Sequence, residues 1–157
     1  MKQHQYQIDV TWTGSNRAGT RSYTSYERSH TVAVPGKPLL ECSSDPAFRG
    51  DRSKYNPEEL FVASLSSCHM LWFLHLCSDA GICVTSYTDS ATATMEESAD
   101  RGGRFTEVIL HPEATITDPS RIEEANTLHH EANRLCFIAS SCNFPVRHHP
   151  VCHAAPL

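Results

Sequence analysis

The sequence has 157 residues, enough for one domain with a sizeable core, and its 39% hydrophobic and 20% charged content is typical of a globular protein. The formal charge of −5 argues against nucleic acid as the natural partner. Serines and histidines interrupt the most apolar run, residues 60–77, so we expect no membrane span. No apolar signal-peptide core is visible. We therefore expect a cytoplasmic protein whose seven cysteines, an odd number, are mostly free thiols.

The first third of the chain predicts short strands joined by turns. Residues 20–34 are rich in Tyr, Thr and Val and predict one or two strands, whereas residues 42–55 are polar and typical of a loop. Residues 5–12 alternate between apolar and polar side chains, which predicts a half-buried strand with one apolar face: Tyr6, Ile8, Val10 and Trp12.

A long apolar helix is predicted over residues 57–80. Asn56 suits the N-cap, Pro57 suits the first helical position, and the two glutamates that follow suit the positive end of the helix dipole. Gly81 suits the stop. Because the helix is apolar nearly all round, we expect it to be buried.

The remaining elements complete an α+β domain that we expect to span residues 1–157. Residues 82–96 and 104–116 alternate and predict a long hairpin turned at the sequence SADRGGR. Residues 119–136 predict a second helix, and residues 144–151 predict a last strand.

The cysteines differ in their surroundings. A buried free cysteine is usually a small hydrophobic side chain, and this reading fits Cys77 and Cys83. Cys42, Cys142 and Cys152 lie in or near predicted loops. In contrast, Cys68 sits in the middle of the long helix among small residues, in the sequence SLSSCH, and Cys136 closes the second helix.

Two thiols on two helices of a cytoplasmic protein suit peroxide reduction. A thiolate attacks the O–O bond and becomes a sulfenic acid, and a second thiol condenses with it to a disulfide. Because Cys68 is predicted mid-helix, the helix dipole cannot stabilise its thiolate, so a nearby arginine is needed. A desolvated arginine in turn requires a carboxylate to balance it.

The sequence NPEELFVASLSSCHM resembles the signature helix of the OsmC/Ohr family, the osmotically inducible protein C and organic hydroperoxide resistance proteins, through Asn56, Pro57, Glu58, Glu59, Leu60 and Cys68. A second stretch, LHHEANRLCFIASSCNFPV, resembles the second helix of the family, with Asn133 at a position where the family has histidine. The sequence is closer to the OsmC-like branch, since Cys136 is not followed by proline.

This resemblance implies antiparallel sheets around a long buried central helix in an intertwined homodimer. It implies a cysteine-based peroxidase in which Cys68 is the peroxidatic thiol, Cys136 the resolving thiol and Glu58 the carboxylate. The arginine stays open. Arg49 precedes the active helix, whereas Arg17 lies in a turn that resembles the Ohr arginine turn. Arg28, in a predicted strand, is the third candidate.

Ten residues of helix span about 15 Å and nearly three turns, so Glu58 and Cys68 do not share a helix face. Glu58 therefore acts, if it does, through an arginine and most simply at the site of the other subunit. The alternative is that it only stabilises the helix start, where acidic residues are common.

Apolar residues near Cys68 predict a pocket for a peroxide with an apolar tail, lined by Leu65, Leu71 and Trp72, because each buried methylene adds about 0.8 kcal/mol. We expect no resident cofactor, no metal, and an external dithiol reductant such as a dihydrolipoyl group. The histidine-rich sequence RHHPVCH is read as a solvated tail. Two other functions stay open, a small-ligand-binding protein with idle cysteines and a redox sensor.

Overall fold

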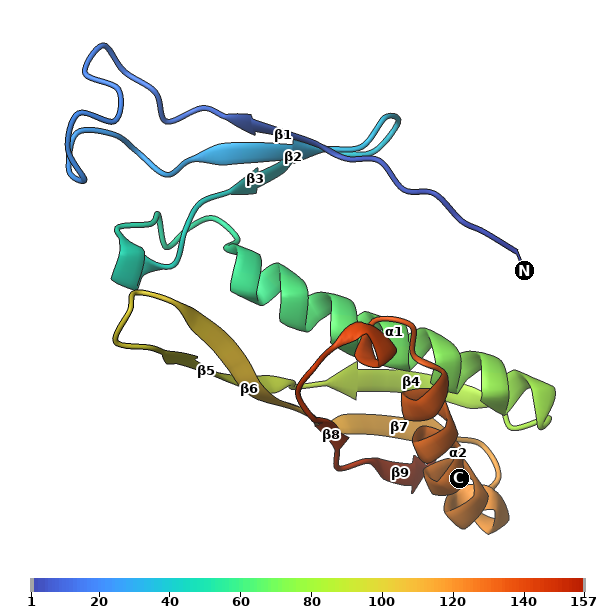
Figure 1. Cartoon of the computed structure of the whole chain (residues 1–157). Coiled ribbons are helices and arrows are strands. Elements are labelled where there is room, and N and C mark those ends of the chain that lie inside the picture. The colour runs from blue at the N-terminus through green and yellow to red at the C-terminus, as the bar shows by residue number, and fades with distance from the viewer. Residues whose placement is uncertain (1, 157) are drawn as a thin grey trace. The chain divides into compact units, whose positions relative to one another are not determined.

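The computed structural model describes residues 2–156, and these form a mixed α+β fold with small sheets and two α-helices (Figure 1). The chain divides between Phe61 and Val62 into two compact units. The predicted α+β class is confirmed. The prediction of one domain over residues 1–157 stays a prediction, and residues 1 and 157 lie outside the described part of the chain.

The first unit holds an antiparallel three-stranded sheet in the order β1 (Asp9–Trp12), β2 (His30–Ala33) and β3 (Leu40–Cys42). The predicted strand at residues 5–12 is confirmed over its second half only. Its expected half-burial is wrong, because every residue of β1 is exposed. Tyr6 is 91% exposed and Ile8 is 58% exposed, so the predicted apolar face is uncovered in the single chain.

The predicted strands at residues 20–34 are confirmed only at β2. Before β2, side chains bond to the backbone and fold the chain into turns: the Asn16 side chain accepts from the Ala18 N–H and donates to the Ser25 carbonyl. Such local bonds compete with strand pairing. The polar loop that follows β3 contains a short 3-10 helix, η1 (Pro46–Phe48), and Arg49 ends it with a positive φ of 66°.

Helix α1 (Pro57–Asp79) begins and ends where the sequence predicts within one residue. The Asn56 side chain accepts from the Glu59 N–H at 2.8 Å, and the Glu59 carboxylate accepts from the Asn56 N–H at 3.1 Å, which is a capping box. At the other end Gly81, with φ of 71°, allows the Ile82 N–H to bond to the Cys77 carbonyl at 2.8 Å. This pattern is a Schellman motif.

Within the single chain α1 buries one stripe rather than its whole surface. Its four buried residues recur at every fourth position: Leu65, His69, Phe73 and Cys77. By length and composition alone α1 could cross a membrane, although no membrane span was expected from the sequence. The core helix of a globular protein meets the same criterion. The other faces of α1 remain more open than predicted.

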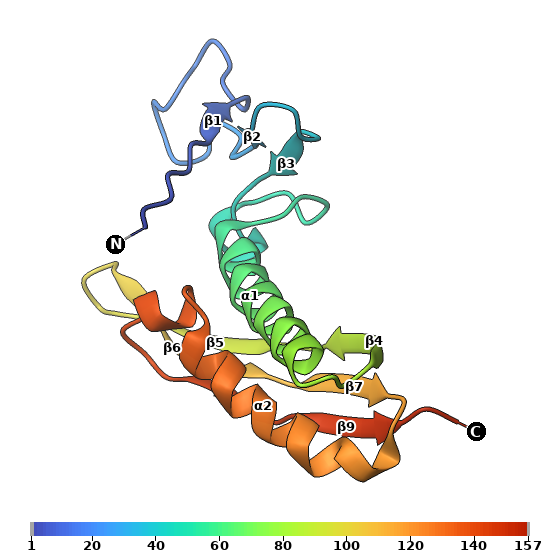
Figure 2. The same ribbon diagram turned by 90° about the vertical axis from the view of Figure 1, so that its right-hand side faces the viewer.

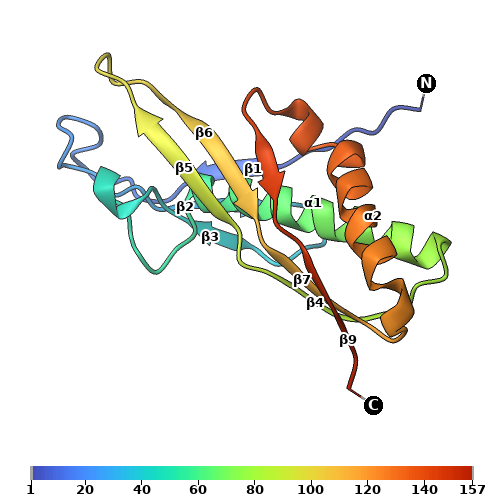
Figure 3. The same ribbon diagram turned by 90° about the horizontal axis from the view of Figure 1, so that it is seen from below.

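The second unit contains two three-stranded sheets, in the orders β4-β7-β9 and β5-β6-β8. Their strands are β4 (Val84–Asp89), β5 (Thr92–Glu97), β6 (Gly103–Leu110), β7 (Pro112–Ile116), β8 (Val146–His148) and β9 (Val151–Ala154). The predicted hairpin therefore exists, turned where expected, but it is interrupted in the middle and pairs as β4 with β7 and β5 with β6. Figure 3 shows β5 beside β6 and β4 beside β7, with the first pair leading into the second.

The expectation of purely antiparallel sheets is wrong. Strand β8 pairs parallel to β6, and β9 pairs parallel to β7. The cause is the connection between β7 and β8, which runs through helix α2 (Ile122–Leu135) and returns the chain in its original direction. The predicted last strand is thus two short strands, and the histidine-rich sequence is part of the sheets rather than a tail.

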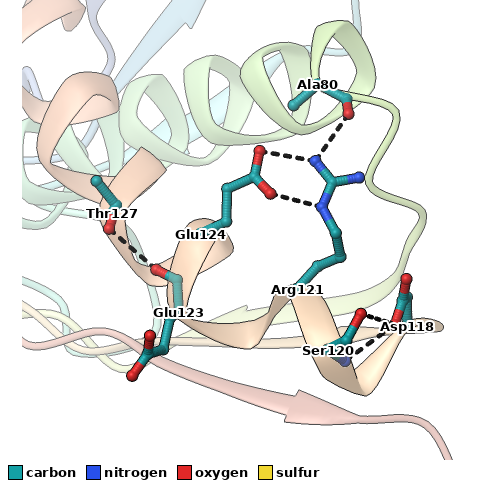
Figure 4. A network of polar contacts seen from close by, with 7 residues as sticks. All are labelled: Ala80, Asp118, Ser120, Arg121, Glu123, Glu124 and Thr127. Atoms are coloured by element: carbon teal, nitrogen blue, oxygen red, sulfur yellow. Dashed lines mark hydrogen bonds and ion pairs between the residues drawn. The ribbon is translucent and has the colours of Figure 1, made fainter.

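Helix α2 follows a short 3-10 helix, η2 (Pro119–Arg121), which Asp118 caps. Arg121 pairs with Glu124 and also donates to the carbonyl of Ala80 at 3.0 Å, just beyond the end of α1 (Figure 4). This contact ties the start of α2 to the end of α1. It therefore helps to fix the two helices that carry Cys68 and Cys136.

The core of the second unit lies between α1, α2 and the β4-β7-β9 sheet (Figure 2). Phe73 of α1, Ile116 of β7 and Ala132 of α2 are fully buried in it. Burial of each large apolar side chain contributes about 1.5–3 kcal/mol, so this core sets the separation of the two helices.

Candidate active site

Cys68 and Cys136 meet in the second unit. Cys68 lies in the middle of α1, and Cys136 is the residue that ends α2. The Cys136 side chain lies close enough to Cys68 for that thiol to raise the pKa of Cys136, although the two residues are 68 positions apart in the sequence. Both are free thiols, with Cys68 half-buried and Cys136 buried. The structure therefore brings together the two cysteines that the sequence motifs single out.

The surroundings of Cys136 keep it protonated. Burial raises the pKa of the Cys136 thiol to about 11, and the neighbouring Cys68 thiol acts in the same direction. The Ala139 N–H, which donates to Cys136 Sγ at 3.4 Å, opposes this only in part. Cys136 is thus a thiol at neutral pH, and it would have to lose its proton when it attacks a sulfenic acid.

A shallow depression of about 180 Å³ lies on the Cys68 face of α1, lined by Leu71, Trp72 and His75. These residues follow Cys68 by three, four and seven positions, which places all four on one helix face. Phe137, directly after Cys136, packs edge-on with Trp72 at a centroid distance of 5.7 Å. The depression therefore lies on the helix face that also carries Cys68, and Phe137 borders it through Trp72.

The predicted pocket residues separate into two groups. Leu71 and Trp72 line the depression, but Leu65 is fully buried in the core. Sequence reasoning missed His75 as a lining residue. Its spacing of seven from Cys68, which puts both residues on one helix face, was a usable signal.

Glu58 and the candidate arginines belong to the first unit. The Glu58 Oε2 atom is buried and has no hydrogen-bond partner among residues 2–156. Arg17 and Arg49 are both exposed. Arg28 is committed locally, because it donates to the carbonyls of Tyr23 and Tyr26 and stacks on both rings. The contact between an arginine and the thiols stays a prediction.

A pair of histidines lies buried next to the thiol-bearing face. His69 Nε2 and His129 Nδ1 are 2.9 Å apart, and both residues are fully buried. The His129 ring stacks on Phe73, and its Nε2 atom lies 3.9 Å from Cys152 Sγ. Burial lowers the pKa of His69 to about 4 and that of His129 to about 3, so both are neutral at pH 7.

The other cysteines are only partly as expected. Cys77 is buried, and burial raises its pKa to about 12, which agrees with the role of a small hydrophobic side chain. Cys83, predicted to be buried, is exposed just before β4. Cys42 and Cys152, placed in or near loops by the sequence, are buried strand residues.

No group of three or more His, Cys, Asp or Glu side chains in the described chain is placed to hold a metal ion. The histidines of the last strands instead contact other rings. His148 Nε2 lies 2.9 Å from His130 Nδ1, and the His149 ring stacks on His111.

Residues 50–149, well over half of the chain and including both thiols, match the family model described as OsmC-like protein. The chain therefore belongs to the OsmC-like protein family, and the resemblance proposed from the two sequence motifs is confirmed. No curated protein matches the sequence.

Solved structures agree with this family. An OsmC-like protein of unknown function from Vibrio cholerae is 29% identical with a TM-score of 0.84, covering 95% of this chain and 100% of its own. An organic hydroperoxide resistance protein from Elizabethkingia anophelis is 20% identical with a TM-score of 0.67, covering 98% and 100%. Its counterpart from Legionella pneumophila is 18% identical with a TM-score of 0.67, covering 96% and 99%. The last two similarities support the fold alone.

Proposed function

We propose that the protein is a thiol-dependent peroxidase that reduces organic hydroperoxides to alcohols. The observation that carries this proposal is the pair of neighbouring thiols, Cys68 and Cys136, together with an apolar depression on the face of α1 that also carries Cys68. A binding protein has no need for two thiols in contact. The names of the Elizabethkingia and Legionella relatives, organic hydroperoxide resistance proteins, point to the same chemistry.

The reaction follows from the roles of the two thiols. The Cys68 thiolate attacks the terminal oxygen of the hydroperoxide, the O–O bond breaks, and the alkoxide leaves and takes up a proton to form the alcohol. Cys68 is then a sulfenic acid. The Cys136 thiol condenses with it, releasing water and forming a Cys68–Cys136 disulfide, which an external dithiol, such as a dihydrolipoyl group, reduces. The site needs no resident cofactor for this cycle.

The working form that we propose is a cytoplasmic homodimer. The open faces of α1, the unpartnered Glu58 Oε2 atom and the exposed apolar side chains of β1 all support a second copy as the covering partner. In this dimer Glu58 meets Arg49 or Arg17, and the arginine stabilises the Cys68 thiolate. Neither nucleic acid nor a membrane is part of the proposal.

The experiment that tests the function mixes reduced protein with cumene hydroperoxide, counts free thiols and then adds dithiothreitol. A peroxidase loses two thiols and consumes many equivalents of peroxide once the dithiol is present. A redox sensor loses two thiols but does not turn over, and a ligand-binding protein keeps all seven. Either of the last two results would contradict the proposal.

Oxidation by one equivalent of hydroperoxide should give a disulfide-linked peptide pair containing Cys68 and Cys136, because these thiols already contact each other. Mass spectrometry of a digest prepared without reductant measures it. The Cys83→Ser variant is the control, since Cys83 is an exposed thiol with no proposed role. A dominant linkage through Cys77 or Cys142 would rule out the resolving role of Cys136.

Replacing the arginine that serves the site should slow Cys68 oxidation at neutral pH, because less of the thiol is then ionised. We expect Arg49→Ala to show the larger effect and Arg17→Ala to stay near wild type. Stopped-flow oxidation rates and thiolate absorbance against pH measure both. Arg147→Ala, which breaks only the surface pair with Glu107, is the control. If all three variants match the wild type, thiolate activation by these arginines is wrong.

A further inference from the structure

Beyond the two thiols, three aromatic rings form a cluster beside the depression on α1, namely Trp72, His75 and Phe137. The Trp72 ring contacts the His75 ring at a centroid distance of 5.7 Å and an angle of 70°, and the Phe137 ring at 5.7 Å and 88°. Both contacts are edge-to-face, an arrangement that aromatic rings favour. The three rings therefore form an ordered surface rather than separate apolar side chains.

In the single chain this cluster is partly open to solvent. Phe137 is 69% exposed, Trp72 is half-buried, and His75 is exposed, with its Nε2 atom 3.5 Å from an Asp79 carboxylate oxygen. Exposed large aromatic side chains gathered at one place usually mark a binding surface. The contact with Asp79 positions the His75 imidazole, which forms one wall of the depression.

The three rings also follow the two thiols in the chain. Trp72 and His75 follow Cys68 on the same face of α1, and Phe137 directly follows Cys136. A hydroperoxide whose O–O bond is at Cys68 would therefore place the other end of its molecule among the three rings. Aliphatic walls alone would suit any apolar tail, but rings arranged in this way add edge and face contacts that only another ring can use fully.

We propose that the depression recognises aryl-substituted hydroperoxides, with the ligand ring held by Trp72, His75 and Phe137. This inference rests on the proposed function and narrows its substrate class. The walls are the Trp72 ring, the His75 imidazole and the aliphatic side chain of Leu71, and Phe137 extends them through its contact with Trp72. Trp72 is the central contact, because it touches both other rings.

Three tertiary hydroperoxides with the same reacting centre separate ring recognition from apolar area. They are tert-butyl hydroperoxide, cumene hydroperoxide and the cyclohexyl analogue of cumene hydroperoxide. Ring contacts predict that kcat/KM for the cumyl compound exceeds that for the cyclohexyl compound by roughly three- to ten-fold, although both tails bury a similar area. Equal values for these two compounds would overturn the proposal.

Two variants locate the effect. Trp72→Leu keeps an apolar wall but removes the ring, so it should abolish the preference of the cumyl over the cyclohexyl compound. Leu71→Ala is the matched control, because it removes aliphatic area from the same depression and should lower kcat/KM for both compounds equally. If Trp72→Leu keeps the preference for the cumyl over the cyclohexyl compound, these rings do not recognise the substrate.

Two further measurements keep the inference separate from the proposed function. Binding of cumyl alcohol, the reaction product, to Cys68→Ser protein is followed by NMR and should be at least three-fold tighter than binding of its cyclohexyl analogue. This result would support ring recognition even if no hydroperoxide turns over, whereas equal binding would contradict it. Size-exclusion chromatography of Trp72→Leu should match the wild type. Loss of a dimer would instead assign the rings to a subunit interface and overturn the proposal.

Discussion

Cys68→Ser should reduce peroxidase turnover to roughly a thousandth or less of the wild-type rate, because a serine hydroxyl is not ionised at neutral pH and cannot replace the thiolate. The fold should survive, since Cys68 is only half-buried and serine is close in size. Turnover of cumene hydroperoxide with excess dithiothreitol measures the activity, and thermal unfolding checks the fold.

The control for this prediction is Cys83→Ser, which removes an exposed thiol before β4 and should turn over at the wild-type rate. Cys136→Ser should behave differently from both. It should still react once with hydroperoxide, because Cys68 remains, and should accumulate the sulfenic acid, which dimedone traps. Substantial turnover by Cys68→Ser would assign the nucleophile to another residue.

The second large effect concerns the buried histidines. His69 and His129 are neutral in the folded protein, with pKa values of about 4 and about 3, whereas an unfolded imidazole has the ordinary value of about 6.5. Between these values the unfolded chain binds more protons, so stability falls as the pH falls below 6.5. From pH 7 to pH 5 we expect a loss of about 2 kcal/mol for each imidazole.

Urea unfolding at pH 7, 6 and 5 measures this loss. Four other ionisable side chains face the His69–His129 pair: His148, His130, Tyr87 and Cys152. In the double variant His69→Gln/His129→Gln two amides can keep a hydrogen bond but do not titrate, so the dependence of stability on pH should flatten. His153→Gln, at an exposed position, is the control. A double variant as pH-sensitive as the wild type would contradict this account.

The features predicted correctly from the sequence are those that local chemistry decides. The bounds of α1 follow from Asn56 and Gly81, whose capping hydrogen bonds involve residues close to them in the chain. That Cys68 and Cys136 are neighbours was also expected, but through the resemblance to a family rather than through spacing, and their disulfide stays a prediction. No local rule links residues on two separate helices.

The features that were missed depend on contacts between distant parts of the chain. The parallel pairing of β8 and β9 follows from the path of α2, which composition does not reveal. The sequence RHHPVCH was read as a solvated tail because its residues are polar, yet Cys152 is buried against His129. The arginine partner stays open because five arginines precede the motif and neither charge nor spacing singles out one of them.

The closeness of Cys68 and Cys136 within one packed unit bears on whether the protein could act as a redox sensor. Closing the proposed disulfide would bring two sulfur atoms to about 2.0 Å, and here the two thiols start as neighbours. We therefore expect the reduced and oxidised proteins to expose nearly the same surface away from the thiols. A redox sensor must have two conformations that its partner binds with different affinities, because a partner that binds both states equally shifts no equilibrium. A thiol pair that closes almost in place leaves little for a partner to distinguish, but it lets a catalyst reset in each cycle with little reorganisation.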